Sequence, residues 1–466
     1  MHGQKNVQFL LAIFAFIAVG WLMPTPEGLP QTGKMALAVG AFAIIVWMTS
    51  CIEGALSGLM IVFLLAITGA AKVAQAFSGY ANTSLWLIVI GFLMAGVMEH
   101  SGLSKRIALY LVALSKGVSS RIYWSIAASI AILTFFVPSI TARTLLMLPI
   151  ILGIGESFNA KEGESNIVKA LLLIVAMSGT MMSIGVLTSH VANPITVGMI
   201  QSATGKLITW AEWFRVGGPP AFLLGFLSIF VIKFMYPPEI ENIGEGGAYV
   251  KRELAAMGPI SRKEIYTLVI FLITLILWAT DSYTKIPVVT VGLLSVLLLL
   301  LPGIGVMDWK EAQCKIPWSV YILYGGGLSL GAVLVSSGAA KWLANTMLSP
   351  LHPFPLTIQI IALIWIVTIM QVLFTGGGPK TTALTPIVIA YAGTIGADPL
   401  VMALVLGMNM QHQYLLPVSN MPNAVIVGTP HITEKELMKT GAVMSILGAG
   451  FFSLVVLTYW KWIGLL

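Results

Sequence analysis

Apolar segments of transmembrane length recur along nearly the whole chain, and this pattern restricts the fold more than any other feature. Hydrophobic residues make up 58% of the 466 residues and charged residues only 9%, whereas soluble domains carry roughly 25% charged residues. A helix needs about 20 apolar residues to cross the hydrocarbon core of a bilayer. Only residues 237–264 form a polar interval of appreciable length. The sequence therefore predicts an all-α polytopic membrane protein without a separate soluble domain.

Eleven transmembrane helices are predicted, together with two apolar segments that are each split by a polar tip. The helices are expected near 7–23, 34–50, 52–70, 83–114, 166–204, 214–236, 264–281, 286–303, 317–348, 399–428 and 440–464. In segments 121–155 and 355–396 the tip leaves two short arms, which fold back more readily than they span. We expect both segments to be re-entrant hairpins.

The basic residues indicate the orientation of the chain. With the N-terminus in the cytoplasm, most of the 25 Lys and Arg residues fall in inner loops, as the positive-inside rule requires. This count predicts a cytoplasmic N-terminus and an outside C-terminus. The net charge is +7, but the basic residues are scattered over short loops and form no patch suited to a phosphate backbone. Nucleic acid is therefore not an expected partner, and the lipid bilayer is.

One motif occurs in both hairpins. Residues 135–150 read FFVPSITARTLLMLPI and residues 374–387 read FTGGGPKTTALTPI. Aligning their second prolines places Arg143 opposite Lys380. A charge at the centre of a membrane helix costs roughly 2.5–3.5 kcal/mol on insertion scales, so matched cations indicate a function that uses them. An anion is the expected partner.

A second motif follows each hairpin. Residues 185–194 read GVLTSHVANP and residues 415–424 read LLPVSNMPNA. Matching Asn193 with Asn423 aligns the polar residues that precede them. Proline and polar residues in these segments predict broken helices, whose free backbone groups can contact a ligand.

The two halves of the chain are expected to have opposite orientations. Similar pairings recur at an offset of about 236 residues, and five helices lie between equivalent elements. Because five is an odd number, the second copy must be inverted. Inverted repeats are typical of transporters, in which substrate sites lie near the midplane where discontinuous helices of both halves meet.

Three segments of the chain resemble the signature sequences of a known family. SITARTLLMLPI resembles the Ser-Asn-Thr hairpin signature of the divalent anion/sodium symporter family, LLPVSNMPNAVIVG resembles its second signature, and NTSLWLIVIGFLMAGVMEHSGLSKRIAL resembles its fourth helix. The resemblance covers nearly the whole chain. It implies a homodimeric elevator transporter in the bacterial inner membrane, with a scaffold from residues 1–120 and 237–354. The transport unit would comprise residues 121–236 and 355–466.

The chain departs from the family pattern at both tips. The first tip, Ser139-Ile140-Thr141, lacks the asparagine, and the second, Gly376–Gly378, has no side chains. A cation four residues beyond each tip would repel sodium by several kcal/mol at low dielectric. We therefore expect sodium-independent exchange of a C4-dicarboxylate, 2-oxoglutarate or citrate. A residual sodium site at Ser139, Thr141, Gly376 and Gly378 remains an open alternative, and no other metal is expected.

The predicted substrate site combines polar residues of both halves. Its members are Ser139, Thr141, Arg143, Ser189, His190, Asn193, Gly376, Gly377, Gly378, Lys380, Thr381, Ser419, Asn420 and Asn423. Arginine can bind a carboxylate through two hydrogen bonds, whereas lysine supplies a compact charge. For His190, packing is as good an interpretation as substrate binding. No cofactor is expected.

Rival functions remain open at this stage. Sodium- or proton-coupled symport of a dicarboxylate or of sulfate fits the same two cations. A membrane anion sensor that binds without transport belongs to a different class. An enzyme is not expected, because the helices contain no metal-ligand cluster, Ser-His-Asp set or paired carboxylates.

Overall fold

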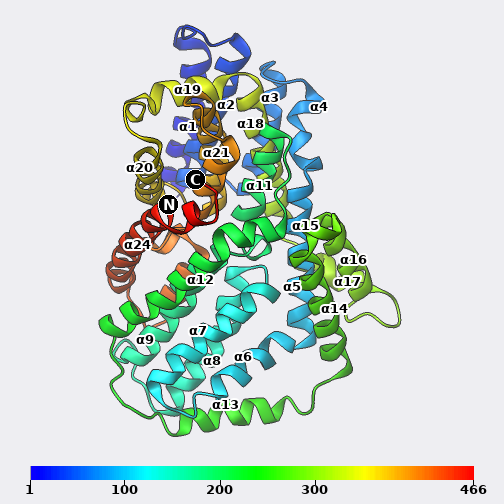
Figure 1. The fold of residues 1–466 in the computed structure, drawn as a ribbon, viewed down its shortest axis with the longest axis vertical. Coiled ribbons are helices and arrows are strands. Elements are labelled where there is room, and N and C mark those ends of the chain that lie inside the picture. Colours follow the sequence, from blue (N-terminus) through cyan, green and yellow to red (C-terminus); the bar gives the residue numbers. More distant parts are fainter. Residues whose placement is uncertain (1) are drawn as a thin grey trace.

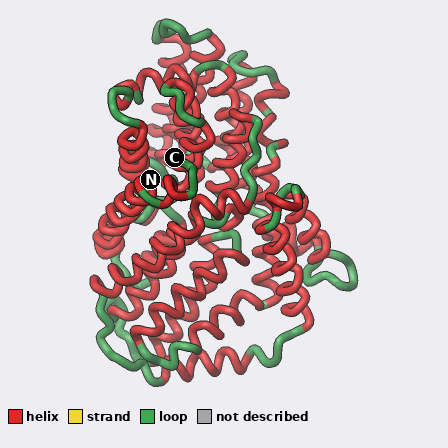
Figure 2. Tube along the Cα trace, viewed as in Figure 1, coloured by secondary structure: helices red, strands yellow, loops and turns green. Residues whose placement is uncertain are grey.

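A computed structural model describes residues 2–466, which form helices joined by loops and no β-strand (Figure 2). In the first half the α-helices are α1 (His2–Ile17), α2 (Gln31–Thr49), α3 (Gly54–Ile67), α4 (Val73–Ala76), α5 (Thr83–Ser101), α6 (Leu103–Ala113), α7 (Ser119–Phe136), α8 (Ile140–Ser157), α9 (Asn166–Leu173), α10 (Gly179–Ile184), α11 (Ala192–Thr204) and α12 (Trp210–Met235).

The second half continues with a similar series of helices. They are α13 (Glu245–Ala256), α14 (Arg262–Ala279), α15 (Asp281–Thr284), α16 (Val288–Leu300), α17 (Trp309–Ala312), α18 (Trp318–Ser336), α19 (Ala339–Met347), α20 (Leu356–Ile369), α21 (Gly377–Thr394), α22 (Pro399–Asn409), α23 (Met421–Val427), α24 (Glu434–Leu457) and α25 (Tyr459–Trp462). The π-helical segments are η1 (Ala18–Leu22) and η3 (Ile174–Ser178). The 3₁₀ segments are η2 (Ser78–Ala81), η4 (Leu187–Ser189), η5 (Gln313–Lys315), η6 (Ser349–Leu351), η7 (Met370–Val372) and η8 (Pro417–Ser419).

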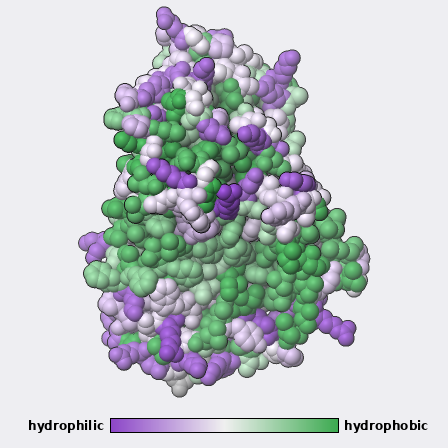
Figure 3. All heavy atoms as spheres, in the orientation of Figure 1, coloured by the Kyte–Doolittle hydropathy of each residue, from purple (hydrophilic) through white to green (hydrophobic). Residues whose placement is uncertain are grey.

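The predicted fold class is confirmed. Within residues 2–466, nine helices are long and apolar enough to cross a membrane, and shorter apolar helices accompany them. Hydrophobic residues cover much of the middle of the visible face, and hydrophilic residues gather along its lower edge (Figure 3). An apolar surface of this extent suits lipid rather than water. The predicted number of eleven transmembrane helices stays a prediction.

Two segments predicted as single helices are each interrupted at a glycine. Gly102 follows α5 directly with φ +81°, and Gly338 precedes α19 directly with φ +78°, so α6 and α19 start in new directions. Only glycine adopts this left-handed conformation without strain. The two glycines are 236 residues apart, which is the offset that the sequence repeat predicts.

Helix α13 lies in the interval that the sequence analysis treats as a polar gap. It crosses the lower end of the molecule (Figure 1). Its buried side consists of Val250, which is 1% exposed, and the half-buried Leu254 and Met257. These residues recur at helical spacing. Hydropathy alone did not reveal the helix because charged residues such as Lys251, Arg252 and Glu253 interrupt its apolar residues.

The two hairpins approach the centre of the molecule from different ends. Helices α7 and α8 lie in the lower part of Figure 1, and α20 and α21 lie in its upper part. Short connections at residues 137–139 and 373–376 form the two tips. Each of α7 and α8 has 18 residues. The re-entrant character of the hairpins stays a prediction.

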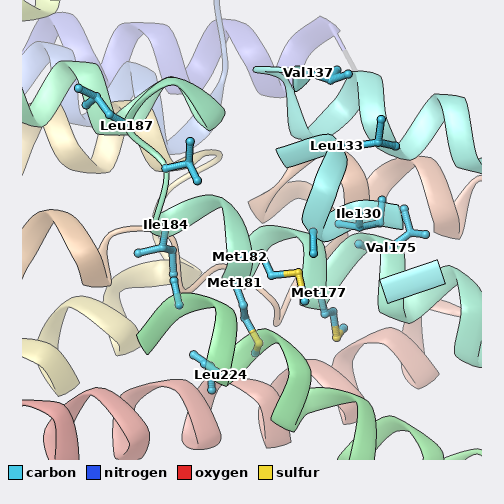
Figure 4. Packing of buried hydrophobic residues seen from close by; sticks show 14 of the residues in the cluster. Ile130, Leu133, Val137, Val175, Met177, Met181, Met182, Ile184, Leu187 and Leu224 are labelled. Carbon is cyan, nitrogen blue, oxygen red and sulfur yellow. The ribbon is translucent and has the colours of Figure 1, made fainter. Parts of the chain in front are cut away.

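The first broken helix is enclosed by other helices. Its arm Asn166–Ile184 is buried over its whole apolar window. Figure 4 shows Leu133 of α7 and Leu224 of α12 on different sides of Met181 and Met182. Close packing of this kind resists local rearrangement. The arm therefore supports the break that follows it.

Candidate functional site between the hairpin tips

A cavity of about 870 Å³ lies where both hairpin tips and both helix breaks meet. Seven of the predicted site residues line it, namely Ser139, Thr141, His190, Gly376, Gly377, Gly378 and Asn420. Seven others do not line it and are at most 1% exposed, namely Arg143, Ser189, Asn193, Lys380, Thr381, Ser419 and Asn423. The first group surrounds the cavity, and the second group lies behind it.

An asparagine amide holds the first helix break. Asn193 Nδ2 donates to the carbonyl oxygens of Ser183 and Val186, both at 2.9 Å. These carbonyls lie where α10 ends, so they lack the amide partner that a continuing helix would provide. Asn193 is fully buried. Its side chain therefore stabilises a break that would otherwise leave unpaired polar groups in the interior.

The second helix break has the same arrangement. Asn423 Nδ2 donates to the carbonyl oxygens of Gln413 at 3.2 Å and Leu416 at 3.1 Å. Each of these three residues is 230 positions beyond its counterpart in the first break. The backbone dihedrals also match, since His190 has φ −144° and ψ 139° and Asn420 has φ −152° and ψ 139°. The two breaks that the sequence repeat predicts as equivalent thus have the same hydrogen-bond pattern and the same backbone conformation.

Arg143 points away from the cavity and into the first break. Its guanidinium donates to the Thr134 hydroxyl, to Ser183 Oγ at 2.6 Å and to Ser189 Oγ at 3.0 Å. A further bond reaches the carbonyl oxygen of Ser189 at 3.3 Å. All of these acceptors are neutral oxygens. Arg143 therefore fastens the hairpin to the break behind it, a role that the sequence analysis missed along with Thr134 and Ser183.

Lys380 is also buried behind its tip, with fewer contacts. Its Nζ donates to the carbonyl oxygen of Val367 at 3.4 Å, and the side chain is 0% exposed. The side-chain amides of Gln411 and Gln413 are buried without a hydrogen-bond partner in the described protein. Among the described residues, both halves therefore retain buried polar atoms without a partner, since Arg143 Nε and Asn193 Oδ1 in the first half are also unpaired.

Gln371 fastens the second hairpin to its break. Its Oε1 accepts from the backbone N–H of Tyr414 at 3.0 Å and of Leu415 at 3.3 Å, and its Nε2 donates to Ser445 Oγ at 2.9 Å. Gln371 is 237 residues beyond Thr134, the same offset that relates the two cations. The repeat register is the sequence signal that could have identified both residues.

Both tips present the N-terminus of a long helix to the cavity. Ser139 Oγ caps α8 by accepting from the N–H of Ala142 at 3.2 Å. In α21 the equivalent turn is glycine, and a Cβ at Gly378 would lie 2.0 Å from the Tyr324 hydroxyl. Glycine is therefore required for this approach. Helix N-termini carry partial positive charge, so both tips favour an anion in the cavity.

Each break contributes one hydrogen-bonding side chain to the cavity, beside the apolar Val191, Val418 and Met421. His190 Nδ1 accepts from the N–H of Ala192 at 3.1 Å, and Asn420 Nδ2 donates to Thr180 Oγ1 at 3.1 Å. Both side chains line the cavity. Of the residues behind them, Thr381 donates to the carbonyl oxygen of Gly377 at 2.8 Å.

Comparison with known sequences decides the family. Residues 4–466 match the family described as "Sodium:sulfate symporter transmembrane region". The chain belongs to this family. The resemblance to divalent anion/sodium symporters found in the sequence is thereby confirmed, and this family member is a multi-pass membrane transporter and not an enzyme.

Individual relatives of this family member extend over most of the chain. A "Membrane protein" of Cupriavidus necator is 32% identical over 98% of this chain and 92% of its own length. A "Sodium-dependent dicarboxylate transporter SdcS" of Staphylococcus saprophyticus is 28% identical over 93% of this chain and 88% of its own length. The Staphylococcus aureus protein of the same name is 28% identical over 92% of this chain and 86% of its own length.

Solved structures of two transporters share the fold. The YdaH transporter of Alcanivorax borkumensis superposes with a TM-score of 0.59 at 14% identity, covering 92% of this chain and 98% of its own. MtrF of Neisseria gonorrhoeae gives a TM-score of 0.58 at 13% identity, covering 98% and 95%. At these identities the likeness concerns the fold alone.

Proposed function

We propose that this protein is a secondary transporter for a divalent anion, and that a dicarboxylate binds in the cavity between the two hairpin tips. The observation that carries the proposal is the convergence of both tips and both helix breaks on one cavity of about 870 Å³. Converging discontinuous helices of two repeats are the usual substrate site of such carriers. The names of the SdcS relatives support a dicarboxylate.

Neutral donors and helix termini would hold the anion. Ser139 and Thr141 from the first tip, and the backbone at Gly376–Gly378 from the second, border the cavity. His190 and Asn420 add one side chain from each break. A carboxylate at each tip would complement the partial charge of both helix N-termini.

For the coupling ion, sodium symport is the first candidate. The family description and the names of the SdcS proteins both specify sodium. The comparisons do not support the sodium-independent exchange that the sequence analysis favours, and they agree better with its alternative. Oxygen atoms of Ser139 and Thr141, together with carbonyls of the second tip, would supply the hard ligands that sodium needs.

Sodium-independent exchange remains a second candidate because of Arg143. Behind the first tip, its guanidinium is bonded to the hydroxyls of Thr134, Ser183 and Ser189 and to the Ser189 carbonyl oxygen. The fixed charge of Arg143 would take the place of a bound sodium ion. Lys380 has the equivalent position in the second half. Under this reading the bound anion would offset both charges, which favours obligatory exchange.

The oligomeric state, the membrane orientation and the moving part of the protein complete the proposal. We propose a homodimer in the bacterial inner membrane, with the N-terminus in the cytoplasm and the C-terminus outside. Residues 1–120 and 237–354 would form its scaffold, and residues 121–236 and 355–466 its moving transport unit. The close bonding of each hairpin to its own break supports movement of that unit as one body, as in an elevator.

The test is uptake of labelled succinate, citrate, 2-oxoglutarate and sulfate into proteoliposomes. Symport predicts uptake that collapses when sodium is replaced by choline. Exchange predicts uptake that requires internal substrate and is indifferent to that replacement. Saturable binding without flux under either condition would contradict transport and favour an anion sensor.

A further inference from the structure

Two ion pairs line the cavity between the tips and helix α13. Lys105 Nζ lies 3.0 Å from Glu253 Oε2, and Lys315 Nζ lies 3.0 Å from Glu99 Oε2. Among the lining residues of this cavity in the described chain, these four are the only Lys, Arg, Asp or Glu. An anion in the cavity therefore meets these lysines, and not the cations buried behind the tips.

Both lysines are available to a ligand. Their side chains are 44% exposed at Lys105 and 38% exposed at Lys315, whereas Arg143 is 1% exposed. An exposed ion pair contributes little to stability, because water screens the two charges. A dianion can therefore displace one of these carboxylates at little energetic cost. The lysine then forms an ion pair with the dianion instead of with its glutamate.

The position of Lys315 depends on one side of α5. Phe92, Ala95, Gly96 and Glu99 line the cavity at the spacing of one helical face. A Cβ added at Gly96 would lie 2.8 Å from Cγ of Lys315 and 2.9 Å from its Cβ. The lysine stem therefore lies directly on the helix, and its ammonium group is held at the Glu99 end of this face.

The position of Lys105 depends on the anchorage of α13. Its neighbour Arg106 bonds Glu264 Oε1 at 2.6 Å and the carbonyl oxygens of Gly258 at 2.9 Å and Met257 at 3.3 Å. These contacts fix the end of α13 against α6. Glu253, one turn earlier in α13, is thereby kept beside Lys105.

We propose that Lys105 and Lys315 bind the anionic substrate at the mouth of the cavity, before it reaches the tips. Glu253 and Glu99 are their resting partners and compete with the substrate for them. This inference rests on the proposed function, since it assumes that the anion uses this cavity. It assigns a substrate-handling role to four residues outside both hairpins and both breaks.

The proposal predicts opposite effects for the two members of each pair. Lys105→Gln and Lys315→Gln should weaken binding of succinate and sulfate about three- to tenfold at low ionic strength, and raising the salt concentration should reduce the difference. Glu99→Gln and Glu253→Gln should tighten binding, because they remove the competitor and leave the lysine. A purely structural ion pair would give losses of the same sign for both members.

Equilibrium binding of labelled succinate and sulfate to the protein in nanodiscs measures these effects, with sodium held constant and choline chloride added as salt. The matched control is Lys161 with Glu164, a pair at 3.6 Å whose side chains are 78% and 70% exposed and which does not line the cavity. Lys161→Gln and Glu164→Gln should leave binding unchanged.

Three results would overturn the proposal: no binding of either anion by the unmodified protein, lysine variants that bind like Lys161→Gln, or lysine and glutamate variants that shift affinity in the same direction. Flux is measured separately in proteoliposomes. If the protein binds as expected but shows no flux, transport is refuted, while the proposed binding of the anion by Lys105 and Lys315 still holds.

Discussion

Replacing either asparagine that holds a helix break tests the architecture of the site. Asn193→Leu and Asn423→Leu keep most of the side-chain volume and remove the donor that serves two carbonyl oxygens in each break. Each buried carbonyl left unpaired costs about 1–3 kcal/mol, so each variant should lose about 2–6 kcal/mol of stability. The loss should be larger for Asn193, because its two bonds are shorter.

Denaturant titration of the detergent-purified protein, followed by tryptophan fluorescence, measures this loss. Asn166→Leu is the control, because its Nδ2 donates to the carbonyl oxygen of Pro237 at an exposed position. Water can replace that bond, so the control should lose less than about 1 kcal/mol. Variants at Asn193 and Asn423 that unfold like the control would refute the argument that these amides support the breaks.

Two further predictions concern contacts around the site. Gly378→Ala should reduce transport by more than about tenfold, because its Cβ would meet the Tyr324 hydroxyl, whereas Gly393→Ala in the same helix has nothing within 4 Å and should transport normally. Equal activity of both alanine variants in the uptake assay would contradict this. Arg106→Met should destabilise the protein by about 3–5 kcal/mol by leaving Glu264 buried and unpaired, and adding Glu264→Met should recover much of that loss. A double variant less stable in denaturant than Arg106→Met would contradict it.

Much of the fold could be predicted from hydropathy and from the repeated motifs. Apolar runs identify membrane helices because the bilayer imposes both their length and their composition. The pairing of Asn193 with Asn423 also correctly predicted equivalent helix breaks, in which each amide donates to two carbonyl oxygens. Helix α13 was not predicted, because an amphipathic helix has no long apolar run.

The direction of the two cations could not be obtained from the motif alone. The sequence analysis places Arg143 opposite a shared substrate, yet its side chain lies on the face of α8 that carries Met147 and Ile154. Leu145 and Pro149, on the other face, line the cavity. Helical periodicity separates these faces, but which face meets the cavity depends on tertiary packing.

The lysines at the mouth were also missed, for a different reason. Lys105 lies within the predicted helix 83–114 and Lys315 in the loop before the predicted helix 317–348, and neither belongs to a repeated motif at the tips. Their carboxylate partners are 148 and 216 residues away in the chain. No local pattern reveals such a pairing, because it arises only when α13 and α5 are brought to the cavity.

The bonds that fasten each hairpin to its break have a mechanical consequence. Arg143 joins α8 to Ser183 in α10 and to Ser189 within the first break, and Gln371 of η7, directly after α20, is bonded to the second break. A tip held in this way cannot swing open by itself, because its displacement would pull several buried hydrogen bonds apart together. We expect ligand exchange to proceed through movement of whole helical bodies, and the two tips to keep their shape during it.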